Sequence, residues 1–114
     1  MTTPQRCTLQ KLTPALKKKW VEALRSGKYR QARSSLCSRD KSNHVKYCCL
    51  GVYIKICGAK FAGPFLHYKD GYSSTTLPDE IIPGRVQGEC IQLNDIEKKS
   101  FKQIADYIEK EVTP

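Results

Sequence analysis

The feature that most constrains the fold is a short and almost uninterrupted apolar run near the middle of the chain. Residues Tyr47–Cys57 read Tyr-Cys-Cys-Leu-Gly-Val-Tyr-Ile-Lys-Ile-Cys, and Gly58 follows them. A run with a single charged residue has to be buried on nearly all sides, as a helix or as a strand. Its length and the Gly58 stop favour a helix, whereas its β-branched residues favour a strand. We predict the central helix of the fold, with Gly51 permitting a close approach of backbone.

Another helix is predicted before this run, over about Pro14 to Ser26. Thr13 is a favourable N-cap residue, proline is common at the first helical position, and Gly27 suits the left-handed residue after the last turn. The apolar residues at helical spacing are Leu16, Trp20, Ala23 and Leu24. Because it lies on this stripe, Trp20 is predicted to anchor the core rather than to serve as a stacking platform.

A third helix is predicted near the end of the chain. Ser100 and Gln103 have the spacing of a capping box, in which each residue satisfies a backbone N–H of the other. Apolar residues follow at helical spacing, namely Phe101, Ile104, Ala105, Ile108 and Val112. We expect this stripe to pack on the other two helices.

Turns and short strands are predicted between the second and third of these helices. Phe65–Tyr68 and Tyr72–Thr75 flank Lys69-Asp70-Gly71, and Asp-Gly tolerates the positive φ of a hairpin turn. Further along we expect one helical turn at Leu77–Ile82, a stop at Pro83-Gly84 and a short strand at Glu89–Leu93.

These elements together predict an α+β fold with about three main helices and a small antiparallel sheet or hairpin. A length of 114 residues suits one compact domain over residues 1–114, with residues 1–12 as a flexible or extended N-terminal segment. No apolar run reaches the roughly 18 residues that a membrane-spanning helix needs, so no membrane partner is expected. Residues 1–7 lack the apolar core of a signal peptide, and we therefore expect a cytoplasmic protein.

The formal charge of +9 is concentrated in the first 46 residues. These hold twelve Lys or Arg against two Asp or Glu, a balance of +10, whereas residues 47–114 hold eight against nine. Such asymmetry attracts polyanions or phosphorylated small molecules. The alternative is that the surplus only keeps the protein soluble.

The six cysteines are Cys7, Cys37, Cys48, Cys49, Cys57 and Cys90. Adjacent cysteines inside an apolar run, in a chain with no secretion signal, indicate reduced thiols that behave as small buried apolar residues. A zinc site usually combines closely spaced cysteine or histidine pairs, and His44 and His67 stand alone. We expect no metal and no other cofactor.

Three blocks of sequence resemble a group of small accessory proteins encoded by tailed bacteriophages. They are Trp20-Val-Glu-Ala-Leu-Arg-Ser-Gly-Lys-Tyr-Arg-Gln31, then Tyr47-Cys-Cys-Leu-Gly-Val52, then Leu93-Asn-Asp95 followed by Ser100-Phe-Lys-Gln-Ile-Ala-Asp-Tyr-Ile-Glu109. The blocks occur in the same order and span about residues 15–110. The resemblance implies a setting, a phage protein acting in the bacterial cytoplasm, and implies no activity.

The polar, basic stretch from Ser26 to Arg33 is the main candidate binding segment. Arginine and lysine donate charge-assisted hydrogen bonds to phosphate, a tyrosine can stack on a base, and a glutamine can read a base edge or a ribose hydroxyl. The alternatives are that Tyr29 packs inward, that the cations are solvated, and that Asn94 and Asp95 only form a turn. The candidate ligand contacts are Arg25, Lys28, Tyr29, Arg30, Gln31, Arg33, Tyr47, Asn94 and Asp95.

No motif of phosphate-loop, dinucleotide-binding, metalloprotease or serine-hydrolase type occurs, so we expect no catalytic residue and no enzyme. The leading hypothesis is a non-enzymatic phage protein with an anti-defence role, which sequesters an anionic, nucleotide-type ligand. A nucleic-acid-binding protein that uses the basic N-terminal half is the first alternative. An inhibitor that docks on an acidic host protein is the second, and a homo-oligomer is left open.

Overall fold

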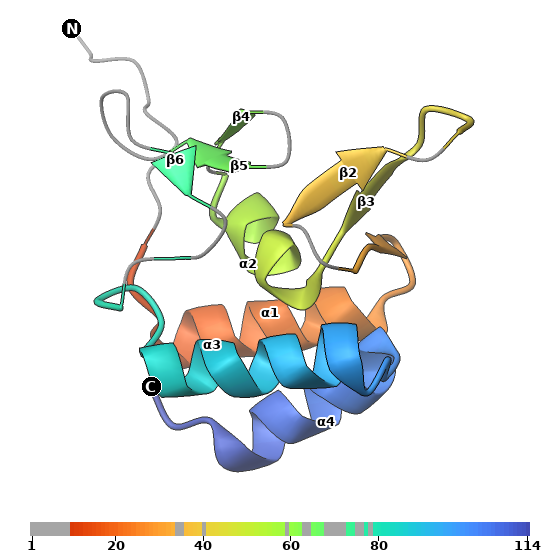
Figure 1. The fold of residues 1–114 in the computed structure, drawn as a ribbon. Helices are drawn as coiled ribbons and strands as arrows, with labels where there is room; N and C mark the ends of the chain where they lie inside the picture. Colours follow the sequence, from red (N-terminus) through yellow and green to blue (C-terminus); the bar gives the residue numbers. More distant parts are fainter. Residues whose placement is uncertain are drawn as a thin grey trace, which may run out of the picture.

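The helices α1, α3 and α4 lie on one side of the central helix, α2, and two small sheets lie on its other side (Figure 1). The computed structural model describes residues 10–33, 36–39, 41–58, 60–62, 65–67, 73–74, 77 and 79–114. Within these ranges the predicted α+β fold is confirmed. The described residues also contain one helix and one sheet that the sequence did not predict.

Helix α1 spans Pro14–Arg25, in agreement with the prediction. The Thr13 hydroxyl accepts a hydrogen bond from the backbone N–H of Leu16 at 3.2 Å, so Thr13 is the N-cap residue. Gly27 has a φ of +79°, and a Cβ built on it would contact nothing within 4 Å. The left-handed backbone therefore explains why residue 27 is a glycine, and crowding does not.

Helix α2 spans Cys49–Cys57 and ends at the left-handed Gly58, which confirms the predicted central helix. It begins two residues after the predicted start, because Tyr47 belongs to strand β3 and Cys48 is the N-cap residue. A Cβ on Gly51 would overlap the backbone carbonyl of Leu36, so the predicted close backbone approach is also confirmed. That same carbonyl accepts a hydrogen bond from the Cys48 N–H at 3.2 Å.

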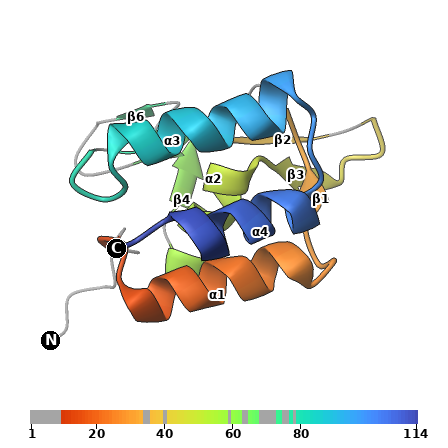
Figure 2. The ribbon, with the colours of Figure 1, turned by 90° about the horizontal axis from the view of Figure 1, so that it is seen from below.

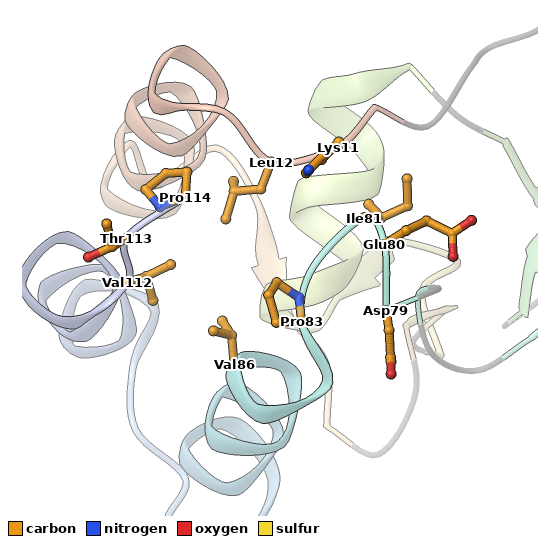
Figure 3. Close-up of a pocket in the computed structure, with 10 residues that line it drawn as sticks. All are labelled: Lys11, Leu12, Asp79, Glu80, Ile81, Pro83, Val86, Val112, Thr113 and Pro114. Carbon is orange, nitrogen blue, oxygen red and sulfur yellow. The ribbon is translucent and has the colours of Figure 1, made fainter.

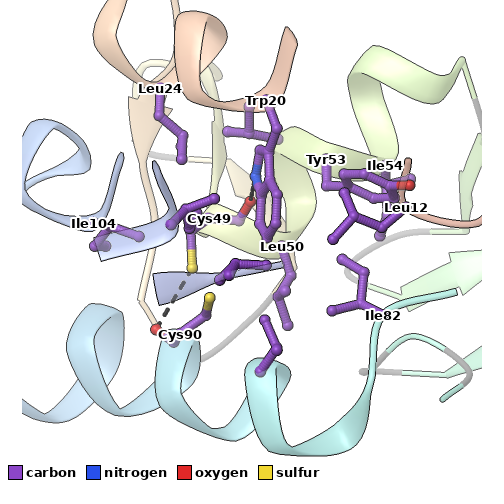
Figure 4. Packing of buried hydrophobic residues seen from close by; sticks show 14 of the residues in the cluster. Leu12, Trp20, Leu24, Cys49, Leu50, Tyr53, Ile54, Ile82, Cys90 and Ile104 are labelled. Carbon is purple, nitrogen blue, oxygen red and sulfur yellow. Dashed lines mark hydrogen bonds between the residues drawn. The ribbon is translucent and has the colours of Figure 1, made fainter. Parts of the chain in front are cut away.

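Trp20 is the centre of the core, as predicted (Figure 4). Its side chain is fully buried, and its indole Nε1–H donates to the Cys49 carbonyl at 2.9 Å. Its ring meets Tyr53 edge to face, with centroids 5.1 Å apart. On the far side of α2, the Cys49 thiol lies 3.5 Å from the Cys90 carbonyl of α3, so these contacts join three helices.

Helix α4 spans Phe101–Glu111 and carries both hydrogen bonds of the predicted capping box. The Ser100 hydroxyl accepts from the Gln103 N–H, and the Gln103 side chain accepts from the Ser100 N–H. Its apolar stripe is buried, and α4 lies beside α1 although the two helices are far apart in the chain (Figure 2).

Helix α3 spans Gly84–Ile91 and continues as a π-helix, η1, over Gln92–Ile96. The predicted strand at Glu89–Leu93 is therefore wrong, and Pro83-Gly84 starts a helix instead of ending one. Proline is compatible with a helix start because the first helical N–H groups need no partner within the helix. Of the predicted helical turn at residues 77–82, the structure shows a turn at residues 79–81, which leads into α3.

Two polar residues lie on the buried face of α3 and η1. They interrupt the helical period of apolar residues, which is why this helix was not predicted from the sequence. Gln87 is 4% exposed; its amide donates to the carbonyls of Leu77 and Ile82 and accepts from the Leu77 N–H. Asn94 is fully buried. With Val86 and Cys90 they form one inward stripe in which polar side chains take two apolar positions.

The first sheet consists of β1 (Arg30–Gln31), β2 (Cys37–Arg39) and β3 (Val45–Tyr47) in the order β1-β3-β2. Strand β1 runs parallel to β3, and β2 runs antiparallel to it. These strands were not predicted, because two or three residues are too few to show an alternating pattern.

The second sheet consists of β4 (Lys60–Ala62), β5 (Phe65–His67) and β6 (Ser73–Ser74) in the order β4-β5-β6. Antiparallel pairing of β5 with β6 confirms the predicted hairpin strands. The predicted turn residues, Lys69-Asp70-Gly71, lie outside the described residues.

Candidate functional site

The basic segment after α1 is held against the helical layer by its polar side chains. Gln31 of β1 donates from Nε2 to the Asn94 side chain and to the Lys99 carbonyl, both at 2.8 Å. Arg33 donates from Nε to the Asn94 carbonyl at 3.0 Å. The segment is thereby fixed beside η1, over 60 positions away in the sequence.

Asn94 is the centre of this connection. Its Nδ2 donates to the Ala32 carbonyl at 2.9 Å and to the Asp95 carboxylate at 2.7 Å, while its Oδ1 accepts from Gln31. Every polar group of the Asn94 side chain therefore has a partner inside the protein. The Asn94 amide and the Nε2 group of Gln31 are thus engaged within the protein, where they position the segment.

Replacing Asn94 by alanine should destabilise the fold by about 2–4 kcal/mol, because it leaves the Ala32 carbonyl and the Gln31 amide without their buried partner. Urea unfolding monitored by tryptophan fluorescence measures this loss. Asp95→Asn is the matched control, since its amide oxygen can still accept the hydrogen bond from Asn94 Nδ2, and it should cost less than about 1 kcal/mol. Equal effects of the two variants would contradict the central role of Asn94.

Arg25 directly precedes the segment, but its side chain lies on the seam between α1 and α4. Its Nη2 bridges the carboxylates of Asp106 and Glu109, at 2.7 and 2.8 Å. The hydrogen bond from Arg25 lowers the pKa of the Glu109 carboxyl, and the two carboxylates raise the pKa of Arg25. Arg25 thus joins two helices, and its charge is already neutralised.

Tyr29 and Tyr47 form an aromatic pair at the inner side of the first sheet. Their ring centroids lie 5.7 Å apart at an interplanar angle of 82°, and both half-buried rings pack against the core. Burial raises the pKa of the Tyr47 hydroxyl. Tyr29 keeps part of its ring at the surface, at the start of β1.

Arg30, Lys46 and Ser38 form a row across the outer side of the first sheet. The register pairs Arg30 with Lys46 and Lys46 with Ser38, so the three side chains lie next to one another on three strands. Their neighbours along the strands, Gln31 and Tyr47, point to the opposite side and into the helical layer. We call Arg30, Lys46 and Ser38 the cationic row.

Neither cation of this row forms an ion pair within the part of the chain that the structure describes. Like charges on directly opposed strand positions repel each other and destabilise a sheet. Arg30 is exposed, whereas Lys46 and Ser38 are half-buried. The row is therefore an arrangement that costs stability and is open to an anion.

The structure brings some of the predicted contacts together and separates others. On or beside β1 lie Lys28, Tyr29, Arg30 and Tyr47. The hydrogen-bonded network that joins the segment to η1 contains Gln31, Arg33, Asn94 and Asp95, and Arg25 lies on the helical seam. The sequence analysis missed Lys46 and Ser38. The alternation of side chains in β2 and β3 would have indicated them, had these strands been predicted.

A cavity of about 410 Å³ lies at another end of the molecule (Figure 3). Its wall is mainly apolar, from the start of α1, the start of α3 and the end of the chain. None of the predicted contacts lines it. The lining residues are Lys11, Leu12, Asp79, Glu80, Ile81, Pro83, Val86, Val112, Thr113 and Pro114.

The described cysteines are all free thiols, and burial raises the pKa of the Cys48 thiol to about 11. Such a thiol is a poor nucleophile at neutral pH. No group of three or more His, Cys, Asp or Glu side chains suited to a metal ion occurs among the described residues. In the same part of the chain, no helix has the length and apolar character to cross a membrane.

These features define a small α+β protein with a cationic row on one sheet. The chain belongs to the family described as domain of unknown function DUF8296, whose model matches residues 12–87. The matched region runs from the start of α1 into α3 and includes the whole cationic row. No curated protein and no solved structure matches the chain significantly.

Proposed function

We propose that the protein is a non-enzymatic binding protein that holds an anionic, nucleotide-type ligand at the cationic row. The observation that carries the proposal is the pairing of Arg30 with Lys46 across two strands, with neither charge compensated by a described acidic residue. A bound phosphate would convert their repulsion into two charge-assisted contacts.

The chemistry of the row suits a phosphoryl group. An arginine fork can bind two phosphate oxygens, a lysine adds a point charge, and the Ser38 hydroxyl can donate a further hydrogen bond. Lys28 precedes the row and is exposed. Tyr29 lies on the inner side of the sheet, but β1 is an edge strand, so the base of a nucleotide bound at the row could reach around this edge to the exposed part of the Tyr29 ring. This contact would favour a nucleotide over inorganic phosphate.

The setting of this function is part of the same proposal. The sequence blocks that resemble accessory proteins of tailed phages support a protein that acts in the cytoplasm of an infected bacterium. There it would counter host defence by sequestering a nucleotide-type signal. A binder needs no catalytic group, in keeping with the absence of a catalytic motif in the sequence.

The test compares a variant of the row with a variant of equal charge elsewhere. Arg30→Gln/Lys46→Gln should weaken binding of ATP by at least about tenfold, because each charge-assisted hydrogen bond contributes about 1.5–3 kcal/mol. Lys18→Gln/Lys19→Gln on α1, where both lysines are exposed, should change the affinity less than about twofold. Calorimetric titration and thermal unfolding with ATP measure both variants.

A short single-stranded oligonucleotide, titrated at about 50 and 200 mM salt, separates the alternatives. Tight, salt-sensitive binding of the oligonucleotide with no binding of ATP would replace the nucleotide ligand by nucleic acid. Equal losses in the two variants would show that total charge acts instead of the row. No binding of either probe would overturn the proposal and leave an acidic host protein as the partner.

A further inference from the structure

One face of α3 and η1 is exposed along its full length. The residues on it recur at helical spacing and lie opposite the buried stripe of Val86, Cys90 and Asn94. Figure 2 shows α3 at one edge of the molecule, on the side away from α1. The residues of this face, which we call the α3 face, are Arg85, Gly88, Glu89, Gln92 and Ile96.

Gly88, in the middle of this face, has no explanation within the described structure. Glycine lowers the stability of a helix interior relative to alanine. A Cβ on Gly88 would meet nothing within 4 Å, unlike one on Gly51, and its backbone has no positive φ. A glycine on an exposed helix face does, however, allow another helix to come close.

Ile96 is the only large apolar side chain that is exposed among the described residues, with 66% of its surface accessible. It lies two turns beyond Gly88 on the same face. It ends the π-helix, and Lys98 just beyond it has a φ of +53°, which is unfavourable for a residue with a side chain. An exposed apolar side chain thus lies at the end of a π-helix, two residues before an unfavourable backbone conformation.

The charges of the α3 face are complementary to those of the same face on a second copy of the chain. Arg85 and Glu89 flank Gly88, one helical turn apart, and neither forms an ion pair within the described residues. Arg85 also occupies the first turn of α3, where the helix dipole disfavours a cation. In an antiparallel pair of α3 helices, Arg85 of each copy would face Glu89 of the other.

We propose that the α3 face is the interface of a symmetric dimer of this chain. The two α3 helices cross antiparallel at Gly88, where the missing side chain permits close contact. Arg85 and Glu89 form two equivalent intermolecular ion pairs, and Ile96 packs on the partner at each end of the contact. A two-fold axis uses the same patch twice, as the charge pattern requires. This interface is independent of the cationic row.

Charge reversal tests the pairing. Arg85→Glu and Glu89→Arg should each weaken self-association of the chain at least about tenfold, because like charges then meet across the axis. An equimolar mixture of the two variants should form heterodimers, and the double variant R85E/E89R should dimerise again. Sedimentation equilibrium over a dilution series measures all four samples. Circular dichroism of each variant checks its fold, which Arg85→Glu should preserve because it suits the first turn of α3.

Gly88→Gln tests the close approach without the charges. Glutamine favours a helix more than glycine does, so the monomer should unfold at a higher temperature while the dimer dissociates. A wild-type chain that stays monomeric over the dilution series would overturn the proposal. So would a dimer that resists the single reversals, or a mixture of the two variants that stays monomeric.

Discussion

Alanine at position 51 should destabilise the protein by about 3 kcal/mol or more and lower its melting temperature by roughly 10–20 °C. The added Cβ would overlap the Leu36 carbonyl oxygen and come within 3.3 Å of the Tyr47 Cβ. Leu36, just before β2, is held in place because the Cys48 N–H donates to the same carbonyl, and Tyr47 is held as the last residue of β3, where it pairs with Cys37. The backbone therefore has to move, and thermal unfolding by circular dichroism measures the cost.

Gly88→Ala is the matched control for this substitution, because the same methyl group enters a helix with open space around it. It should leave the stability of the monomer unchanged or raise it by about 1 kcal/mol, through helix propensity alone. The comparison is made on dilute protein, so that association does not contribute. Equal destabilisation at both positions would show that steric contact with Leu36 is not the cause.

Removing the side chain of Trp20 should be the most damaging change to the core. Trp20→Ala empties a fully buried site and should cost about 3–5 kcal/mol, which is a large part of the 5–15 kcal/mol that stabilises a typical domain. Because the variant has no tryptophan, urea unfolding is followed by far-UV circular dichroism.

Trp20→Phe separates the two roles of the indole. It retains most of the apolar contact with Tyr53 but leaves the Cys49 carbonyl without the indole donor, so a cost of about 1–2 kcal/mol is expected. Its failure to destabilise the protein would show that the hydrogen bond contributes nothing and that Trp20 acts only through packing.

Two of the helices could be predicted from an apolar stripe and a recognisable start, and α2 could be predicted from its continuous apolar run and the Gly58 stop. Helices α1 and α4 have both, with Thr13 and Ser100 as N-cap residues. Helix α3 has neither, since Pro83 supplies no side-chain cap and Gln87 takes a core position. Its period becomes visible only when the hydrogen bonds from Gln87 to distant backbone groups are known. Such bonds depend on the tertiary structure.

The candidate site was predictable only in part for a related reason. Basic and aromatic residues after α1 are evident from the sequence, and Arg30 and Tyr29 do lie at the surface of the first sheet. Whether an amide faces a ligand or the interior depends on its partner. Gln31 and Asn94 are partners of each other, across 63 positions of sequence. The row of Arg30 and Lys46 likewise depends on strand register, which local sequence does not specify in strands this short.

The seam between α1 and α4 has a consequence for how the chain acquires its structure during synthesis. Lys17 and Arg25 of α1 contact Glu109 of α4, so α1 cannot complete its packing until α4 has been synthesised. Until then the apolar face of α1 has no cover on the side where α4 packs. Contacts of such long sequence separation slow folding and expose the nascent chain to aggregation. Chaperone demand should therefore fall abruptly once α4 has emerged.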